Sequence, residues 1–269
     1  MSSGPILAAT DLSARSDRAV DRAFLLGEQL SRPVCIVHVL EPEEEAAAGE
    51  VEAKIRETLP PGSEKVEVFT PSGNTPEAVA EVAEECGAAV ICAGPARFNS
   101  LKDFILGTAV DYIAREASCP LLVVKQRPHG SYDSIIFATD FSDNSRRALI
   151  KTASLFPEAR FHLLHAFHVP YAAWNKAEHV REELRSEEQA AMDKFIAALG
   201  DEAGLSRRVD GRVERGNLFG GIYDTAEETQ AKLVAFGTHG ESGFRHATIG
   251  SVASELLTNL TLDSLMVRP

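Results

Sequence analysis

The chain has 269 residues, of which 44% are apolar and 25% charged, a composition ordinary for a globular protein with a buried core. Its net charge of −13 repels phosphate backbones and anionic lipid, so nucleic-acid or membrane binding over the general surface is excluded. No segment approaches the ~18 apolar residues of a membrane helix, and no basic leader precedes the first strand, so a cytoplasmic protein is expected.

The first predicted strand covers 6–9 and runs into Thr10-Asp11-Leu12-Ser13. The same pattern returns in a strand over 135–138 that runs into Thr139-Asp140-Phe141-Ser142, so the two aspartates lie 129 positions apart. A helical stretch follows each copy, over 16–30 and 144–156, and then an apolar strand, over 34–39 and 161–167. This repetition predicts two tandem copies of one domain.

The correspondence between the two halves continues to the end of the chain. The apolar run 88–94 corresponds to 231–237, and Gly107-Thr108 corresponds to Gly250-Ser251, now 143 positions apart. The extra residues lie mostly in a longer amphipathic helix, from about 174 to 199, whose charges are interpreted as a solvated face.

Each half therefore alternates strands with helices, in the order β-α-β-α-β-α-β-α-β. The strands are near-continuous apolar runs, as expected when helices cover both faces of a parallel sheet. This pattern predicts an α/β protein of two tandem doubly wound domains. A short Pro- and Gly-containing connection near 126–131 separates the predicted domains 1–127 and 131–269.

The four cysteines include no C-x-x-C pair, and each lies in or beside an apolar run. We interpret them as buried, reduced thiols rather than as a redox or metal motif. These residues are Cys35, Cys86, Cys92 and Cys119.

The most specific feature is a glycine-rich loop between a strand and a helix. It reads Gly237-Thr238-His239-Gly240, then nine residues, then Gly250-Ser251 at a predicted helix start. Glycines allow a backbone to approach a phosphate closely and to adopt positive φ, while loop and helix N-terminal amides point at the anion. The alternative is a purely structural turn.

Asp140 ends the first strand of the same half. In doubly wound sheets the ligand crevice lies outside the carboxyl ends of the strands, so Asp140 can accept hydrogen bonds from ribose hydroxyls. The alternative is an N-cap or Asx turn for the following helix, a role for which Ser142 competes.

The histidines give weaker signals. His162, His165 and His168 are spaced by three, and strand alternation places His165 on the opposite face from the other two, so no metal site is expected. His239 either assists phosphate binding or is merely solvated. The sequence has no nucleophile elbow, no H-E-x-x-H and no Walker loop, so nothing positions Mg²⁺ and a water for efficient phosphoryl transfer.

The glycine-rich loop and the Thr-Asp strand ends of the two halves resemble those of the universal stress protein family. Its G-x2-G-x9-G-(S/T) motif is matched at every required position of the second half, and the Ala-Thr-Asp-x-Ser strand end is family-like in both halves. The resemblance implies a five-stranded parallel sheet in the order 3-2-1-4-5 in each half. It also implies a site for ATP, or for AMP or ADP, with Mg²⁺ as a companion of the nucleotide.

Carried over by position, the resemblance implies a ribose side, an adenine contact through backbone groups and a phosphate cradle. The implied residues are Thr139 and Asp140 for ribose, Ala166 for adenine, and Gly237, His239, Gly240, Gly250, Ser251 and Val252 for the phosphates.

The first half departs from the motif. It reads Gly94-Pro95-Ala96-Arg97, so an arginine replaces the second glycine and a proline removes an amide donor. We therefore expect nucleotide in the second half only. The alternative is that the Arg97 guanidinium, a good phosphate partner, points outward and clamps the ligand. The second half departs elsewhere, because the family's Cys-Pro before the last strand, present as Cys119-Pro120, becomes Leu262-Asp263.

The fifth strands, 121–124 and 265–267, are expected at bare sheet edges, which invite pairing. This predicts that the two halves form an intramolecular pseudo-dimer through these edges, and a further homodimer is left open.

The primary functional hypothesis is a stress-associated regulatory protein that binds an adenine nucleotide in its C-terminal domain, with little or no hydrolysis. One alternative is a structural or interaction protein with vestigial loops and no nucleotide. Another is an enzyme, such as an ATP-dependent ligase or a pyrophosphatase on a related fold, for which the sequence offers no catalytic constellation.

Overall fold

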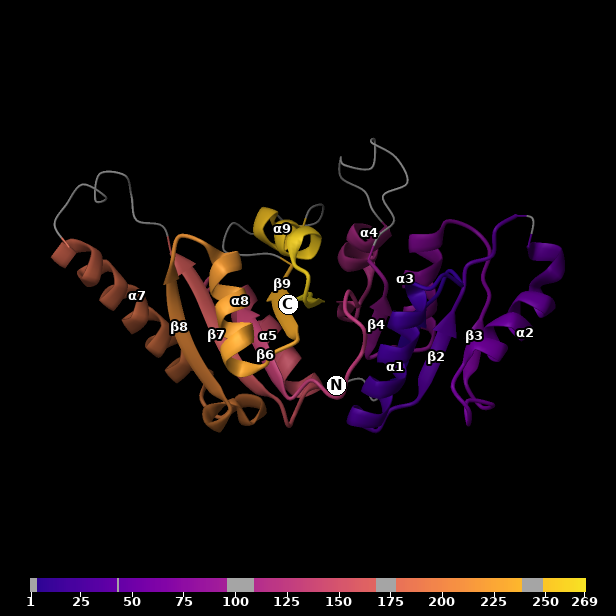
Figure 1. Ribbon diagram of the computed structural model, residues 1–269, viewed down its shortest axis with the longest axis horizontal. Coiled ribbons are helices and arrows are strands. Elements are labelled where there is room, and N and C mark those ends of the chain that lie inside the picture. The colour runs from indigo at the N-terminus through magenta and orange to yellow at the C-terminus, as the bar shows by residue number, and fades with distance from the viewer. Residues whose placement is uncertain (1–3, 43, 96–108, 168–177, 239–248) are drawn as a thin grey trace. The chain divides into compact units, whose positions relative to one another are not determined.

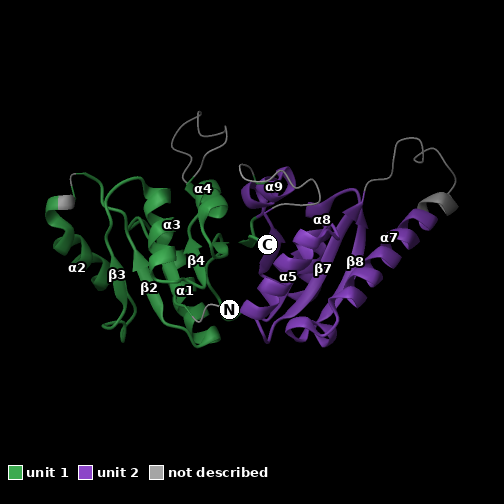
Figure 2. Ribbon diagram, turned by 180° about the vertical axis from the view of Figure 1, so that it is seen from behind, with its two compact units in different colours: residues 1–131, 247–249, 261–268 green, residues 132–246, 250–260, 269 purple. Residues whose placement is uncertain are grey.

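A computed structural model describes residues 4–42, 44–95, 109–167, 178–238 and 249–269. By contacts between residues the chain divides into two compact units (Figure 2). Unit 1 contains residues 1–131, 247–249 and 261–268, and unit 2 contains residues 132–246, 250–260 and 269.

Unit 1 alternates strands and helices along the chain (Figure 1). It also receives one strand from the C-terminal end of the chain. Its elements are β1 (Ile6–Ala9), α1 (Ser16–Leu30), β2 (Val34–Val37), η1 (Glu45–Ala47), α2 (Ala48–Thr58), β3 (Glu67–Phe69), α3 (Thr75–Glu85), β4 (Val90–Ala93), α4 (Ala109–Glu116), β5 (Leu121–Val123) and β10 (Asp263–Val267).

Unit 2 repeats the alternation (Figure 1). Its elements are β6 (Ser134–Ala138), α5 (Asp143–Leu155), β7 (Arg160–Phe167), α7 (Glu178–Leu199), η2 (Glu202–Arg207), β8 (Val209–Arg215), α8 (Leu218–Thr229), β9 (Leu233–Gly237) and α9 (Ser251–Asn259). No helix of the described ranges is both long and apolar enough to cross a bilayer.

The strand order confirms the predicted fold class. In unit 1 the order is β3-β2-β1-β4-β5, all parallel, and in unit 2 the strands β8-β7-β6-β9 follow the same order from the equivalent edge. Unit 1 is nevertheless a mixed sheet, because β10 pairs antiparallel with β5. The predicted pairing of these two apolar edges is thus present, with Leu265 opposite Leu122.

Helices cover both faces of each sheet. In unit 1, α1 connects β1 to β2 in one direction across the sheet, whereas α3 connects β3 to β4 in the opposite direction. Crossover connections between parallel strands are right-handed, so α1 and α3 lie on opposite sides of the sheet. The buried strands between them form the core together with the inward-facing residues of the helices.

The edge strands correct one expectation. The central strands are continuous apolar runs, but β3 reads Glu-Val-Phe and β8 reads Val-Asp-Gly-Arg-Val-Glu-Arg. Both lie at the ends of the strand order. Alternating polar side chains are compatible with an edge that is half-solvated, and charges there oppose unwanted pairing.

The longest helix, α7, packs closely on edge strand β8. A Cβ on Gly211 of β8 would lie 2.6 Å from Cγ of Met192 and 2.9 Å from Cδ1 of Ile196. Glu188 lies four residues before Met192, one helical turn along the same face. The glycine therefore sets the approach of the helix that carries Glu188.

We expect Gly211→Ala to lower the free energy of unfolding by about 1–3 kcal/mol, because the added methyl overpacks the helix–strand contact. Gly49→Ala is the matched control, since a Cβ on Gly49 of α2 has nothing within 4 Å and alanine is favoured in a helix. Urea unfolding should show the first variant destabilised and the second unchanged or slightly stabilised. Equal midpoints for Gly211→Ala and the unmodified chain would contradict this account of the packing.

Lys125 follows β5 in a partly buried position. Burial lowers its pKa from 10.5 to about 8, against an opposing effect of the nearby Asp263 carboxylate. Below pH 8 this lysine is charged in both the folded and the unfolded chain, and folding carries the full cost of burying the charge. As pH rises from about 8 to 10.5 the folded state loses the proton first, so that cost disappears.

We expect Lys125→Met to raise the free energy of unfolding at pH 7 by about 2 kcal/mol, after allowance for the solvent that still reaches the amine. The advantage over the unmodified chain should shrink across the window from about pH 8 to 10.5. Denaturant titrations of both proteins at several pH values measure the difference directly. An advantage that does not vary with pH would show that lost charge is not its cause.

Candidate functional site

The predicted ribose residues lie where β6 ends. Thr139 is buried and Asp140 is exposed, directly after the last residue of the strand. Strand β6 pairs in parallel with β7 and β9, so the carboxyl ends of all three reach the same edge of the sheet. The structure thus brings together the strand ends that carry the predicted ribose, adenine and phosphate residues.

A compact turn joins β6 to α5. The hydroxyl oxygen of Thr139 accepts hydrogen bonds from the Phe141 amide at 3.1 Å and from the Ser145 hydroxyl at 2.9 Å. Phe141 has φ 64°, a left-handed conformation that a bulky residue adopts only where its surroundings hold it. The buried threonine hydroxyl therefore stabilises a strained turn.

Asp140 has a structural role in this turn. Its Oδ1 atom accepts hydrogen bonds from the Ser142 amide at 3.1 Å and the Ser142 hydroxyl at 2.6 Å. Ser142, not Asp140, is the N-cap of α5, because its hydroxyl oxygen accepts from the Ser145 amide. The Asx-turn alternative is thus confirmed, and the exposed carboxylate still faces solvent at the strand edge.

His165 connects the ends of β6 and β7. Its Nδ1 atom lies 2.8 Å from the carbonyl oxygen of Thr139, which can only accept, so Nδ1 carries the hydrogen. Its Nε2 atom lies 3.7 Å from Glu188 of α7, and its ring lies 4.2 Å from the ring of Phe141. Ala166, the predicted adenine contact, is the next, half-buried residue of β7.

Two of these contacts were missed by sequence reasoning. Phe141 and Glu188 form the surroundings of His165 together with Phe195, whose ring is 5.6 Å from that of Phe141. Phe141 carried a usable signal, since it immediately follows the singled-out Thr139-Asp140 pair. Glu188 lies among many acids of α7 and carried none.

The described ends of the glycine-rich loop meet. Gly237 is the last residue of β9, and the amide of Gly250 donates to the carbonyl oxygen of Thr238 at 2.9 Å. Gly250 precedes α9, and the first two helical residues, Ser251 and Val252, are exposed. Their amides belong to the first turn of the helix, where no intrahelical acceptor exists.

The structure corrects one of the two reasons offered for Gly250, namely positive φ, and leaves its close approach to a phosphate as a prediction. Gly250 has φ −57°, and a Cβ there would lie 3.5 Å from the Thr238 carbonyl oxygen, an ordinary contact. Neither positive φ nor packing within the described chain requires glycine at this position. His239 and Gly240, both predicted phosphate residues, lie outside the described residues.

The first half contains the same strand-end turn. Leu12 is left-handed with φ 57°, its amide donates to the Thr10 hydroxyl oxygen, and the Ser13 amide donates to Asp11. Nδ1 of His38 lies 2.9 Å from the Thr10 carbonyl oxygen, as His165 does in the second half. The turn is therefore common to both halves and does not by itself distinguish a binding half.

The loop that distinguishes the halves is only partly described. A Cβ on Gly94 would lie 3.5 Å from the Arg15 carbonyl oxygen, so this loop starts against the beginning of α1. Pro95 follows it, whereas Arg97, Gly107 and Thr108 lie outside the described residues. The expected loss of nucleotide binding in the first half stays a prediction.

The remaining histidine and metal hypotheses can be compared with the structure. Nδ1 of His162 lies 2.9 Å from the Asp210 carboxylate on β8, away from His165, and His168 lies outside the described residues. Over the described ranges, no group of three or more His, Cys, Asp or Glu side chains is arranged to hold a metal ion.

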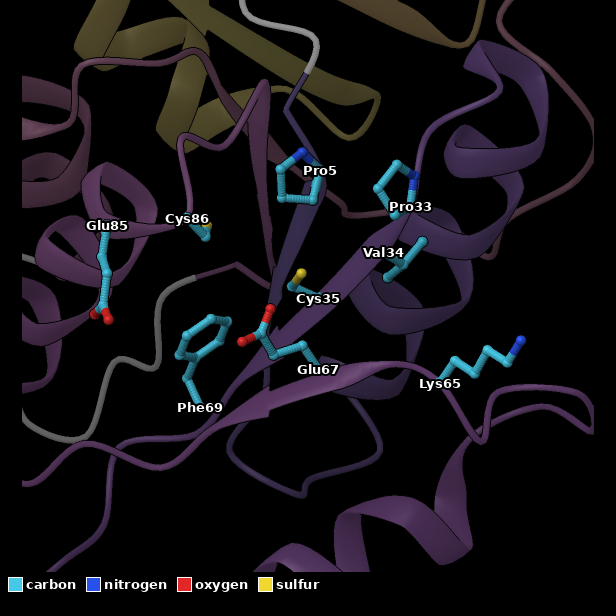
Figure 3. Close-up of a pocket in the computed structure, with 9 residues that line it drawn as sticks. All are labelled: Pro5, Pro33, Val34, Cys35, Lys65, Glu67, Phe69, Glu85 and Cys86. Carbon is cyan, nitrogen blue, oxygen red and sulfur yellow. The ribbon is translucent and has the colours of Figure 1, made fainter.

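A separate pocket of about 410 Å³ lies in unit 1, beside the amino end of β2 and the edge strand β3 (Figure 3). Cys35 and Cys86 both line it, and burial raises the pKa of Cys35 to about 11 and that of Cys86 in the same direction. Both are therefore protonated thiols at neutral pH. None of the four cysteines is joined in a disulfide, in agreement with the predicted reduced thiols, but Cys86 and Cys119 are only half-buried.

Comparison with known proteins identifies the relatives of the chain. The model of the universal stress protein family matches it twice, over residues 3–125 and 131–268. A universal stress protein of Mycolicibacterium smegmatis is 25% identical over 98% of this chain and 97% of its own length. Universal stress protein A homolog 1 of Coxiella burnetii is 31% identical over 44% of this chain and 94% of its own length.

Two solved structures share the fold over nearly the whole chain. A universal stress protein from Archaeoglobus fulgidus has a TM-score of 0.67 at 17% identity, covering 99% of this chain and 96% of that one. A putative universal stress protein from Pseudomonas aeruginosa has a TM-score of 0.64 at 21% identity, covering 98% and 93%. At these identities the likeness concerns the fold alone.

We expect Thr139→Val to lower the free energy of unfolding by about 1–3 kcal/mol, because the Phe141 amide and the Ser145 hydroxyl lose their acceptor. Thr139→Ser keeps the hydroxyl and is the matched control. Thermal or urea unfolding of the two variants gives the comparison. Similar losses for valine and serine would show that the methyl group of Thr139, rather than its hydroxyl, supports the turn.

Proposed function

The chain belongs to the universal stress protein family, and on that premise we propose that its second half binds ATP or a related adenine nucleotide. The protein would serve as a stress-associated regulator that binds the nucleotide with little or no hydrolysis. The observation that carries this proposal is the convergence, within unit 2, of the ends of β6, β7 and β9 with the start of α9.

The phosphate end of the proposed site is the start of α9. The exposed first turn at Ser251 and Val252 offers amide donors and one hydroxyl, and the helix dipole favours an anion there. Gly250 leaves space that nothing else in the described chain requires. Gly237, His239 and Gly240 would complete the cradle.

The ribose end is the turn after β6. Asp140 is an exposed carboxylate at the strand edge, suited to accept hydrogen bonds from sugar hydroxyls, with Thr139 beneath it. Ala166, next to His165, would contact adenine through its backbone groups. Any Mg²⁺ would be held mainly by the phosphates, as is usual for this cation.

A ligand-free interaction protein with vestigial loops is the alternative. The turn after β6 does not exclude it, because the same turn stands in both halves with its own internal hydrogen bonds. The proposal also includes a cytoplasmic location, which cell fractionation tests, and a further homodimer, which light scattering tests. It includes no binding of nucleic acid.

Calorimetric titration with ATP should give one site per chain in the unmodified protein. Asp140→Ala should weaken binding by about 10–100-fold, the value of a hydrogen bond to a charged group. Asp11→Ala is the matched control, because it removes the same amide-to-carboxylate bond from the first half's turn. Gly240→Arg, which copies Arg97 of the first half, should abolish binding.

Each contrary result has a distinct meaning. Binding that survives Gly240→Arg but is lost with Asp11→Ala would place the site in the other half. Two equal sites would show that Arg97 is no barrier. No titratable site, together with no nucleotide released from the denatured purified protein, would favour the ligand-free alternative.

A further inference from the structure

The buried carboxylate of Asp263 holds the start of β10 to the chain that follows β5. Asp263 is 0% exposed, and its Oδ1 atom accepts hydrogen bonds from the amides of Lys125 at 2.7 Å and Gln126 at 2.9 Å. A buried carboxylate is tolerated only where such donors or a cation compensate it. The strand pairing therefore depends on donors that lie outside the ladder itself.

Arg22 of α1 supplies the cation. It is 2% exposed, and its Nε atom lies 3.8 Å from Oδ2 of Asp263. Its Nη1 atom donates to the carbonyl oxygen of Gly130 at 2.7 Å, and Arg18 donates from Nη1 to the Lys125 carbonyl oxygen. Helix α1, β10 and the segment after β5 are thus joined in one polar cluster, the Asp263 seam, consisting of Arg22, Lys125, Gln126 and Asp263.

The internal repeat shows that the position before β5 that corresponds to Asp263 carries no carboxylate. With the offset of 143 positions that relates the ends of the two halves, Asp263 corresponds to Pro120, and Leu265 to Leu122. Leu122 and Leu265 also face each other across the β5–β10 pair. The two strands therefore correspond about their central pair, although Leu121 is replaced by Ser264 and Val123 by Met266. The one difference between them that involves a charge is aspartate in place of proline.

This equivalence allows the competing pairings to be evaluated. If β5 paired with β5 of a second copy in the same register, Pro120 would replace Asp263. The Lys125 and Gln126 amides would lose their acceptor, and Arg22 would stay buried without its carboxylate. Removing one partner from a buried ion pair is strongly destabilising.

Pairing of β10 with β10 of a second copy is also poorly compensated. The counterparts of Lys125 and Gln126 are then Arg268 and Pro269, and proline has no amide hydrogen. Asp263 would keep one of its two backbone donors. Only the β5–β10 combination gives the Asp263 carboxylate both backbone donors together with the Arg22 cation.

We propose that the Asp263 seam is a partner-selection device that makes β5 pair with a β10 strand and reject β5 of a second copy. A bare apolar strand edge accepts any similar edge, whereas a buried charge with dedicated partners discriminates between them. The proposal is independent of nucleotide binding, because it uses no residue of the proposed nucleotide site.

The test is refolding of an equimolar mixture of heavy-isotope-labelled and unlabelled full-length chains from denaturant. The chain concentration should be millimolar, comparable to the effective concentration that a short linker gives β10. After dilution, native mass spectrometry counts the dimers that contain one labelled and one unlabelled chain. Such dimers report strand pairing between two chains during refolding. The unmodified chain should yield almost none, and Asp263→Asn should raise them several-fold.

The decisive variant exchanges the counterpart residues, as Pro120→Asp with Asp263→Pro. It moves the carboxylate onto β5, where β5 of a second copy satisfies Lys125, Gln126 and Arg22, so trapped dimers should become the main species. Asp210→Asn is the control, since this exposed carboxylate of edge strand β8 has ion-pair partners but lies outside the seam. Its dimer content should match that of the unmodified chain.

An exchanged variant that folds as a single chain, or that fails to fold, would overturn the proposal, as would a folded Asp263→Asn with unchanged dimer content. Circular dichroism establishes folding in each case. If Asp263→Asn alone does not fold, the exchanged variant decides the question, because there the carboxylate regains its partners.

Discussion

Parallel pairing of β6 with both β7 and β9 is the constraint on which the candidate site depends. Parallel strands must all end at the same edge of the sheet, so Asp140, Ala166 and Gly237 are brought to one edge although they are far apart in the sequence. The same pairing places the start of α9 beside Thr238, where the Gly250 amide donates to a carbonyl oxygen. Crossover connections supply the helices that bury both faces of this sheet.

The turn after the first strand of each half is built before any ligand is considered. Thr10 and Thr139 each hold the amide of a left-handed residue two positions later, and a histidine from the neighbouring strand lies against the threonine carbonyl oxygen. This arrangement occurs in both halves, which indicates that these residues are required to form the turn itself. Any difference in binding between the halves must come from the glycine-rich segments and from side chains of the turn, where the second half has Phe141 and the first half has Leu12.

The Asp263 seam shows how a pair of apolar strands can become selective for one partner strand. The three ladder pairs between β5 and β10 join apolar or small residues, and none of these residues carries a charge that would select one partner strand. Asp263 adds a buried charge whose donors come from α1 and from the segment after β5. A departure from the family's proline, which by sequence concerned only the last strand, is thus a feature of the contact between the first and last parts of the chain.

The sequence by itself determined the duplication, the doubly wound class, the helix from Ser16 to Leu30 and the placement of a glycine loop before α9. These follow from local patterns, because apolar periodicity, turn residues and motif spacing are written within a few residues of each other. Only the tertiary structure decided that Glu188 and Phe141 surround His165, that Ser142 rather than Asp140 caps α5, and that Asp263 lies buried against Lys125. Asp263 and Lys125 are separated by 138 positions. Contacts over such distances are set by how packed elements meet, and no local pattern encodes them.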